Sequence, residues 1–493
     1  MSSGLTLQGL QGLAPILVLS SGAVVLMLQV SVKRNLQLSY LVTLISLLLA
    51  AFSTGFALEP GEQQVTPLLA ADKYAAFFSL LFCLGGAVTA MVSRDYLAQR
   101  RGQNEEYFLL LLLSTLGAVI LAYANHVASV LLGLELLGVA LYALIAYPDR
   151  AALPLEAAIK YLVLSGAASC IFLFGSGLLY TVLGALDFSG MRAAAQALPV
   201  ERSIIVSVGA AMVIVGLGFK LSVFPFHMWT PDVYEGAPAP VSGFLAAVSK
   251  SAVFAVVLRW WLEAGLYEQE RLVMSVGLLA AASMLFGNLL ALRQENVKRM
   301  LAYSSIAHVG YLLLVLVAIG VSPDRAFAVE AACFYLVAYA STTLAAFTLL
   351  GLLSQRAGDS DQYRDNDYDH DQLQQMNGLF WTQPGLALLF SVALLSLAGI
   401  PLTVGFVGKF YLFTLGVDAS LWGLLSVMVL GSAIGIYYYL RVIYTMTLAA
   451  DRSSRGPQLV SLPGRLLFYT LIGAMLYLGV LPDTLMTYLG TIL

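Results

Sequence analysis

Charged side chains are scarce in this sequence. Asp, Glu, Lys and Arg together make up 11% of the 493 residues, while hydrophobic residues make up 60%. A soluble globular domain carries about 25% charged and about 45–50% apolar residues. This composition excludes an ordinary surface that faces water, so the lipid bilayer must be the main solvent of the chain.

Cysteine and histidine are also few. The three cysteines (Cys83, Cys170 and Cys333) lie within apolar stretches and form no CxxC pair, which excludes an iron–sulfur cluster, because such clusters need grouped thiolates. The four histidines form no obvious facing pair of haem ligands. Gly216 and Gly218 form a GxG, but no GxGxxG follows a strand, which argues against dinucleotide binding. We therefore expect no cofactor and no metal in this chain, and the absence of a basic patch predicts no nucleic-acid partner.

Long apolar runs fill most of the chain. A transmembrane helix needs about 20 apolar residues, and fourteen such windows follow one another between residues 13 and 482. The stretch 107–147 is too long for one straight helix and divides at Asn125-His126. The first 32 residues contain no Lys or Arg, so the first window is expected to be a retained helix and not a secretory signal. The sequence predicts an all-α polytopic membrane protein with about fourteen transmembrane helices.

Positive charge is distributed unevenly between the two sides. The loops after odd-numbered spans carry fourteen Lys and Arg residues, whereas the other loops carry five. Positively charged loops stay in the cytoplasm. Both termini are therefore expected outside, on the side of the membrane away from the cytoplasm.

Two spans contain a proline well inside their apolar stretch. Pro225 lies within 203–228, and Pro401 lies near the middle of 381–414. Proline removes a backbone donor, and in hydrocarbon the freed groups need protein or water as partners. Interrupted helices in corresponding positions of two halves indicate an ion or binding site near the midplane. A simple packing kink at each proline is the alternative.

The two breaks are five spans apart, and because five is odd they predict two inverted five-helix repeats. The expected organisation is an N-terminal three-helix segment (1–106), a first repeat with its broken helix near Pro225 (107–262), a second repeat with its broken helix near Pro401 (272–448) and a C-terminal helix (449–493).

Four charged residues lie too deep in their spans to reach water. Lys250 is about ten residues into its span, which at about 1.5 Å per residue is near the midplane. Glu135 reaches a similar depth, and Lys220 and Lys409 lie near the two breaks. Each central charge costs about 2.5–3.5 kcal/mol, so these groups must be paired or hydrated. A Glu135–Lys220 pair whose separation changed would alter the proton affinity of the lysine, as a proton pump requires. Static ties between helices are the alternative.

Two histidines and three further basic residues also lie within the apolar spans. His308 is a candidate proton relay or a packed hydrogen-bond donor, and His227, just past the first break, has a candidate structural or entry role. Lys160, Arg259 and Arg441 lie nearer the ends of their spans and are expected to extend towards water.

The longest loop, about 355–378, is acidic. Its cluster of Asp365, Asp367, Asp369, His370 and Asp371 lacks the glycine and terminal glutamate of a calcium-binding EF-hand loop. We therefore expect a solvated loop here and not a metal site.

Three segments resemble a known family. FPFHMWTPDVYEGAPAPVSGFLAAVSKSA (224–252), VKRMLAYSSIAHVGY (297–311) and LAGIPLTVGFVGKFYLF (397–413) are similar, in this order, to the antiporter-like membrane subunits of bacterial proton-pumping NADH:quinone oxidoreductase, respiratory complex I. Of the related L, M and N types, WTPDVYEGAP and Ser249-Lys250 resemble the N type. Lys409 stands where the M type has glutamate, and the chain lacks the long lateral helix of the L type.

The resemblance implies particular roles. Glu135 would partner the seventh-helix lysine, Lys220, while Lys250 would be the connecting lysine and Lys409 the exit-side lysine. Quinone reduction elsewhere in the complex would drive proton transfer, with no NADH or flavin bound to this chain. The implied partners are other complex I membrane subunits, including M, K and neighbouring small subunits. An Mrp-like cation/proton antiporter subunit and a structural membrane spacer remain alternatives.

Overall fold

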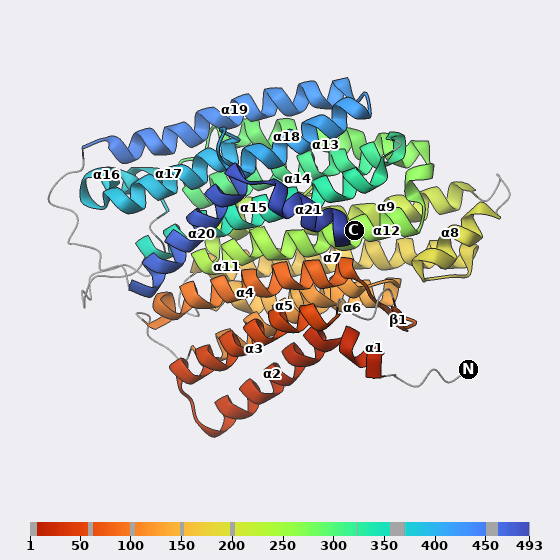
Figure 1. Ribbon diagram of the computed structural model, residues 1–493, viewed down its shortest axis with the longest axis horizontal. Helices are drawn as coiled ribbons and strands as arrows, with labels where there is room; N and C mark the ends of the chain where they lie inside the picture. The colour runs from red at the N-terminus through yellow and green to blue at the C-terminus, as the bar shows by residue number, and fades with distance from the viewer. Residues whose placement is uncertain are drawn as a thin grey trace.

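The computed structural model of the protein describes residues 7–57, 63–98, 104–147, 152–197, 203–322, 324–354, 369, 371–449 and 462–492. Its long helices lie side by side, roughly along the horizontal axis of Figure 1. Within these ranges thirteen helices are long and apolar enough to cross a membrane. The expected all-α polytopic architecture is therefore confirmed.

The first part of the bundle follows the N-terminus. Its elements are α1 (Leu7–Gly12), α2 (Ala14–Val32), α3 (Leu36–Ala57), β1 (Gln63–Thr66), β2 (Leu69–Ala71), α4 (Lys73–Ala98), α5 (Glu105–Tyr123), α6 (Val127–Ile145), α7 (Ala152–Leu183), α8 (Phe188–Gln196) and α9 (Ser203–Leu221). The expected division of 107–147 is confirmed, because α5 ends before Asn125 and the His126 side chain caps the start of α6 by accepting from the Ala128 N–H.

The remaining elements run to the C-terminus. They are α10 (Trp229–Gly236), α11 (Ala239–Phe244), η2 (Leu245–Ser249), α12 (Lys250–Glu263), η3 (Leu266–Glu268), α13 (Glu270–Ala291), α14 (Val297–Val321), α15 (Arg325–Leu353), η4 (Leu373–Met376), α16 (Leu379–Thr382), α17 (Pro384–Ala398), α18 (Val404–Asp418), α19 (Trp422–Thr447), α20 (Leu462–Val480) and α21 (Asp483–Ile492). The π-helical turn η2 joins α11 to α12, so that Ala239–Glu263 forms one continuous span.

Both expected helix breaks are present. The first span stops at Leu221, where Ser222 adopts a left-handed φ of 65°, and the chain resumes as the short α10. The second span is divided into α17 and α18, each too short to cross alone, and the intervening turn contains Gly399 at φ 86° and Leu402 at φ 73°. Counted as one broken crossing beside the thirteen long helices of the described ranges, this pair agrees with the expected fourteen.

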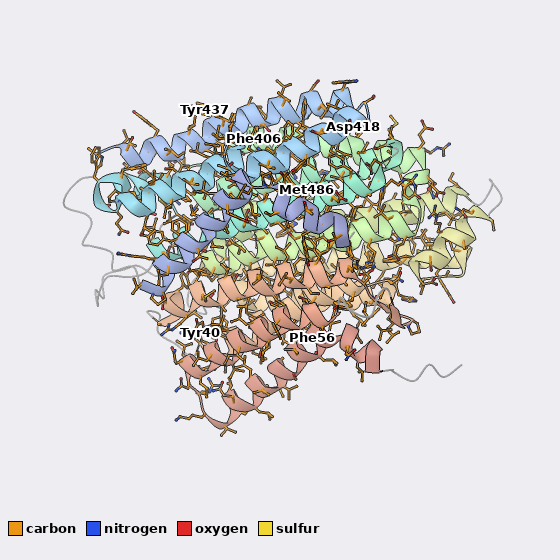
Figure 2. All side chains as sticks on the ribbon, in the orientation of Figure 1. Tyr40, Phe56, Phe406, Asp418, Tyr437 and Met486 are labelled. Atoms are coloured by element: carbon orange, nitrogen blue, oxygen red, sulfur yellow. The ribbon has the colours of Figure 1, made fainter. Side chains whose placement is uncertain are left out.

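The core of the bundle surrounds the span Ala239–Glu263, which is buried as far as Trp261. α14 and α15 are also largely buried, whereas α2, α7 and α19 expose most of their length. Tyr437 lies at the outer edge of α19 in Figure 2 and is exposed, while Tyr438 and Tyr439 are turned inward and buried. A helix that is apolar on all sides belongs in the interior, so the Lys250 helix is the central one.

Four short elements were not expected from the hydrophobic pattern. β1 and β2 form a short antiparallel hairpin before α4, and α8 and α21 are short amphipathic helices. Lys73, at the start of α4, donates to the Thr491 carbonyl of α21 over 3.0 Å, and α1 packs on the hairpin. The first and last described helices therefore lie at the same end of the bundle.

Candidate functional site

Lys220 lies in the last turn of α9, at the first break, and is buried. Its Nζ donates a hydrogen bond to the Ser165 hydroxyl on α7, and the Tyr142 hydroxyl on α6 donates to the same oxygen over 2.6 Å. Gly138 on α6 leaves room for this group, because a Cβ there would lie 3.1 Å from the Tyr142 hydroxyl and 3.7 Å from the Lys220 Nζ. The ammonium group is thus held by a neutral acceptor.

Glu135, the predicted partner of Lys220, forms no direct salt bridge with it among the described residues. Within the described part of the chain its carboxylate makes no ion pair, and its Oε1 accepts a hydrogen bond of 2.6 Å from Ser169 on α7. Ser165 and Ser169 lie one turn apart on the same face of α7. The glutamate and the lysine are therefore bound to neighbouring serines of the same helix.

Lys250 begins α12, directly after the π-helical turn η2. Its Nζ donates to the Ser305 hydroxyl on α14 over 2.6 Å and lies 5.4 Å from the centre of the Tyr234 ring. The lysine is 3% exposed. A π-helical turn inside an α-helix is a rare feature that is frequent at functional sites.

His308 follows Ser305 by three residues and lies on the same face of α14. Its Nδ1 and the Tyr335 hydroxyl are 2.6 Å apart in a hydrogen bond, and its ring packs edge-on against Tyr311, with centroids 5.5 Å apart. The Tyr339 ring lies 5.2 Å away. His308 is therefore surrounded by hydroxylated aromatic rings in the middle of the bundle.

Lys409 is bound at the second break. Its Nζ donates to the carbonyl oxygens of Leu397 and Ala398, each over 2.9 Å. These carbonyls end α17 and have no partner within their own helix, so the ammonium group on α18 satisfies them. The same Nζ lies 5.4 Å from the centre of the Tyr311 ring. Tyr311 therefore lies between His308 and Lys409.

The predicted site residues fall into two groups. Lys250, His308 and Lys409 follow one another through Ser305 and Tyr311, and we call this series the central polar line. Glu135 and Lys220 form a separate group around α7, and within the described residues no hydrogen bond joins Lys220 to Lys250.

His227 lies beside these groups but belongs to neither. Its ring stacks on Phe224, with centroids 5.2 Å apart, and its buried Nδ1 has no partner among the described residues. Tyr234 and Tyr339 likewise have buried hydroxyls that form no hydrogen bond of good geometry there, although both lie close to the Ser305 side chain. Buried polar atoms are rarely left unsatisfied, so these three positions are suited to ordered water.

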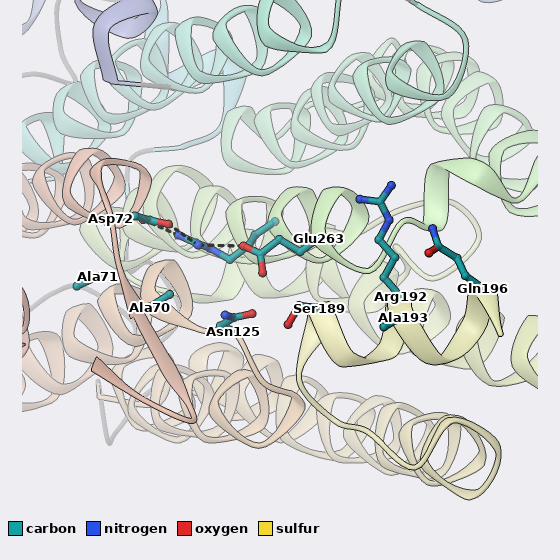
Figure 3. A pocket seen from close by; sticks show the side chains of 10 residues that line it. Ala70, Ala71, Asp72, Asn125, Ser189, Arg192, Ala193, Gln196 and Glu263 are labelled. Atoms are coloured by element: carbon teal, nitrogen blue, oxygen red, sulfur yellow. Dashed lines mark hydrogen bonds and ion pairs between the residues drawn. The ribbon is translucent and has the colours of Figure 1, made fainter. Parts of the chain in front are cut away.

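Arg259 was expected to extend towards water, and this expectation is wrong. It is 5% exposed, and its guanidinium donates to both carboxylate oxygens of Asp72, over 2.6 and 2.8 Å, and to Glu263 over 3.2 Å. Asp72, Arg259 and Glu263 line a pocket of about 670 Å³ together with Arg192 of α8. Figure 3 shows Asp72 and Glu263 on one side of this pocket and Arg192, on α8, on another. Asp72 and Arg259 are 187 positions apart, so no local sequence pattern joined them.

The acidic loop also differs from expectation. Asp369 and Asp371 are buried, and both pair with Lys298, at 2.7 and 3.4 Å, so this part is not solvated. Burial raises the pKa of Asp371, although Lys298 opposes that effect. Asp365, Asp367 and His370 lie outside the described residues. Within the described ranges no group of three or more His, Cys, Asp or Glu side chains could hold a metal ion.

The bound lysines differ in one chemical respect. Lys298 is fixed by a carboxylate, whereas Lys220, Lys250 and Lys409 are held by hydroxyl or carbonyl oxygens. A counter-ion stabilises the charged form of an amine, and neutral acceptors do so less strongly. The three lysines therefore lack the direct carboxylate partner that Lys298 has. Together, fold and site define a class: a polytopic membrane protein with broken helices and a buried series of lysines.

Comparison with known proteins places the chain within a family. Residues 124–435 match the family described as NADH:quinone oxidoreductase/Mrp antiporter, transmembrane. The chain is 46% identical over 451 residues to NADH-quinone oxidoreductase subunit N of Methylococcus capsulatus (strain Bath), covering 92% of this chain and 89% of the relative. The chain belongs to the NADH:quinone oxidoreductase/Mrp antiporter family of membrane subunits, and the resemblance to its N type is confirmed.

Solved structures agree with this family. A chain of respiratory complex I from Thermus thermophilus with bound aureothin is 32% identical, with a TM-score of 0.80 and coverage of 96% of this chain and 98% of that one. A chain of the Mrp complex from Dietzia sp. DQ12-45-1b has a TM-score of 0.84 at 20% identity, covering 98% of this chain and 96% of that one. At that identity the Mrp likeness concerns the fold alone.

Proposed function

We propose that this chain is a proton-translocating membrane-arm subunit of a bacterial NADH:quinone oxidoreductase. The observation that carries the proposal is the series of buried lysines bound only to neutral oxygens, with Lys220 and Lys409 at the two helix breaks. The subunit N relative at 46% identity supports the assignment to this complex over the Mrp alternative.

In the proposed mechanism, protons move along buried side chains while the redox chemistry occurs in other subunits. Lys250 passes a proton towards Lys409 through Ser305, His308 and Tyr311. Lys250 contacts Ser305, and Tyr311 contacts both His308 and Lys409, while Ser305 and His308 lie one turn apart on the same face of α14. Lys220 and Glu135 supply protons to the central polar line from the first break. His227 serves as an entry group for protons beside that break. Ordered water at the unpartnered hydroxyls would connect the two groups.

The proposal extends to partners and location. The chain binds no NADH, flavin, metal or other cofactor, and it contacts complex I membrane subunits such as M, K and neighbouring small subunits. It resides in the bacterial cytoplasmic membrane with both termini on the periplasmic side, as the fourteen-to-five distribution of positive charge favours. The two inverted five-helix repeats remain part of the same proposal.

The test is to replace Lys220 and Lys409 individually with alanine in the assembled complex and reconstitute it in liposomes. We expect NADH:quinone turnover and proton uptake to fall together by at least about tenfold, which corresponds to about 1.4 kcal/mol in a barrier. Lys160→Ala is the matched control, because Lys160 is half-exposed and paired with Asp232. If either variant assembles and retains both activities at the level of this control, that lysine is a static tie and the mechanism fails.

An Mrp-like antiporter would give a different result. Such a subunit would exchange sodium or another cation for protons in vesicles without NADH or quinone. We expect no such exchange from the assembled complex, and its appearance would favour the alternative. A structural spacer would show unchanged turnover and proton uptake in both lysine variants.

A further inference from the structure

The buried end of the acidic loop is bound to three helices. The Asp369 carboxylate accepts hydrogen bonds from the Tyr96 hydroxyl on α4 over 2.8 Å, from the Ala239 N–H over 2.9 Å and from the Lys298 Nζ on α14 over 2.7 Å. The side chains of Asp369 and Lys298 are each 2% exposed. A carboxylate so thoroughly desolvated persists only because all these donors are in place.

The surrounding backbone strengthens this contact. Lys298 also donates to the Ala237 carbonyl over 2.9 Å, just before α11 begins. The Val297 N–H, at the start of α14, donates to the Asp371 carbonyl over 2.7 Å. The loop end is therefore held against α14 and against the first residues of the span Ala239–Glu263.

Both helices lead from this contact to the central polar line. Lys298 and Ser305 are seven residues apart on α14, about two turns, and so lie on the same face. Ala239 starts the span that carries Lys250, with η2 in between. Asp369 thus joins the two helices whose side chains form the hydrogen bond between Lys250 and Ser305.

We propose that Asp369 is a positioning residue for Lys250. Its bonds to the Ala239 N–H and to Lys298 set the position of the span Ala239–Glu263 along α14. That position determines whether the Lys250 Nζ reaches the Ser305 hydroxyl. The inference rests on the proposed proton-transfer function of Lys250. In this arrangement the end of a cytoplasmic loop controls the position of a group near the membrane midplane.

The first experiment measures hydrogen–deuterium exchange in the assembled complex. In Asp369→Asn, the amides of α11 and η2 should exchange about tenfold faster than in the unmodified complex, because a charge-assisted bond at the start of the span is weakened. Asp72→Asn is the matched control, since it removes a carboxylate from a buried ion pair at the opposite end of the same span. It should leave the exchange of α11 and η2 unchanged.

The second experiment is a double-mutant cycle on proton uptake and quinone-linked turnover. Asp369→Asn should lower both severalfold, and in a Lys250→Met background it should have no further effect, because both changes act on one group. Tyr96→Phe, which removes only the donor to Oδ1, replaces Asp369→Asn if that variant fails to assemble.

The outcomes separate the two proposals. Unchanged exchange in α11 and η2, or effects of Asp369→Asn and Lys250→Met that simply add, would overturn the positioning role while leaving the proposed function intact. Full activity of Lys250→Met would instead remove Lys250 from the proton path, and the inference would fail with that assignment.

Discussion

Gly399 shows how one residue controls the place of a lysine. It follows the last residue of α17 with φ 86°, and a Cβ there would lie 2.9 Å from the Cδ of Lys409 and 3.2 Å from its Nζ. An alanine would therefore strain the backbone and displace the amine from the carbonyl oxygens that it satisfies. Left-handed backbone costs a residue with a side chain about 1–2 kcal/mol.

We expect Gly399→Ala to lower turnover and proton uptake together by about tenfold, which is what about 1.4 kcal/mol produces if it falls on the rate-limiting step. Gly166→Ala on α7 is the matched control, because its Cβ would meet nothing within 4 Å and alanine suits a helix. Normal activity of Gly399→Ala in an intact complex would show that Lys409 tolerates the displacement.

At the residue scale, the buried charged residues could be predicted from the sequence, but their partners could not. Depth in the span identified Glu135, Lys220, Lys250 and Lys409 as residues needing a buried partner, and all four have one. Sequence could not identify these partners, because serine hydroxyls and helix-end carbonyls are common and their positions depend on tertiary packing. The coupling of Glu135 to Lys220 stays a prediction, and the two neighbouring serines that bind these groups were not foreseen.

At the scale of elements, the buried ion pair of Asp72 and Arg259 joins the start of α4 to α12. Removing one member of a buried pair leaves a charge without compensation and costs about 3–5 kcal/mol, whereas a more exposed pair contributes about 0–1 kcal/mol. Glu263 contacts Arg259 through one longer bond of 3.2 Å and has a more exposed side chain than Asp72.

We therefore expect Asp72→Ala to lower the temperature at which the subunit dissociates from the complex much more than Glu263→Ala does. The measurement is retention of the subunit on native gels after stepwise heating. Equal shifts would mean that the two carboxylates share the guanidinium evenly. This test concerns stability, and each variant is compared with the unmodified complex at equal protein concentration.

The elements themselves were predictable to different degrees. The membrane helices could be predicted from the long apolar runs, and both breaks from the prolines at 225 and 401. The reason is that the hydrocarbon core of a membrane requires helices of a minimum length and backbone groups that are all hydrogen-bonded. The hairpin of β1 and β2 and the short helices α8 and α21 were missed, because each has at most ten residues and lies outside the apolar runs. The burial of Asp369 depends on donors from α4, α11 and α14, which no local pattern reveals.

At the scale of the whole molecule, the two ends of the bundle differ in charge and in construction. One end carries the hairpin, α8 and both described chain ends, while the other receives the loop end at Asp369 and the loops with most positive charge. If the basic end faces the cytoplasm, Ser189 on α8 lies outside and Gln374 in η4 lies inside. Both residues are exposed, so each can report its side of the membrane as a cysteine.

We expect Ser189→Cys to react with a membrane-impermeant thiol reagent added to spheroplasts, and Gln374→Cys to react only after the membrane is opened. Cys170, which is exposed, is replaced by serine in both variants, whereas Cys83 and Cys333 are buried and remain. The opposite labelling pattern would invert the molecule, so that Asp369 would face the outside and could not transmit a cytoplasmic change to Lys250.

Labelling of both cysteines from one side would contradict the span count, because the sequence from Ser189 to Gln374 contains five crossings: α9, Ala239–Glu263, α13, α14 and α15. An odd number of crossings must place the two residues on opposite sides, and the experiment therefore tests orientation and fold together.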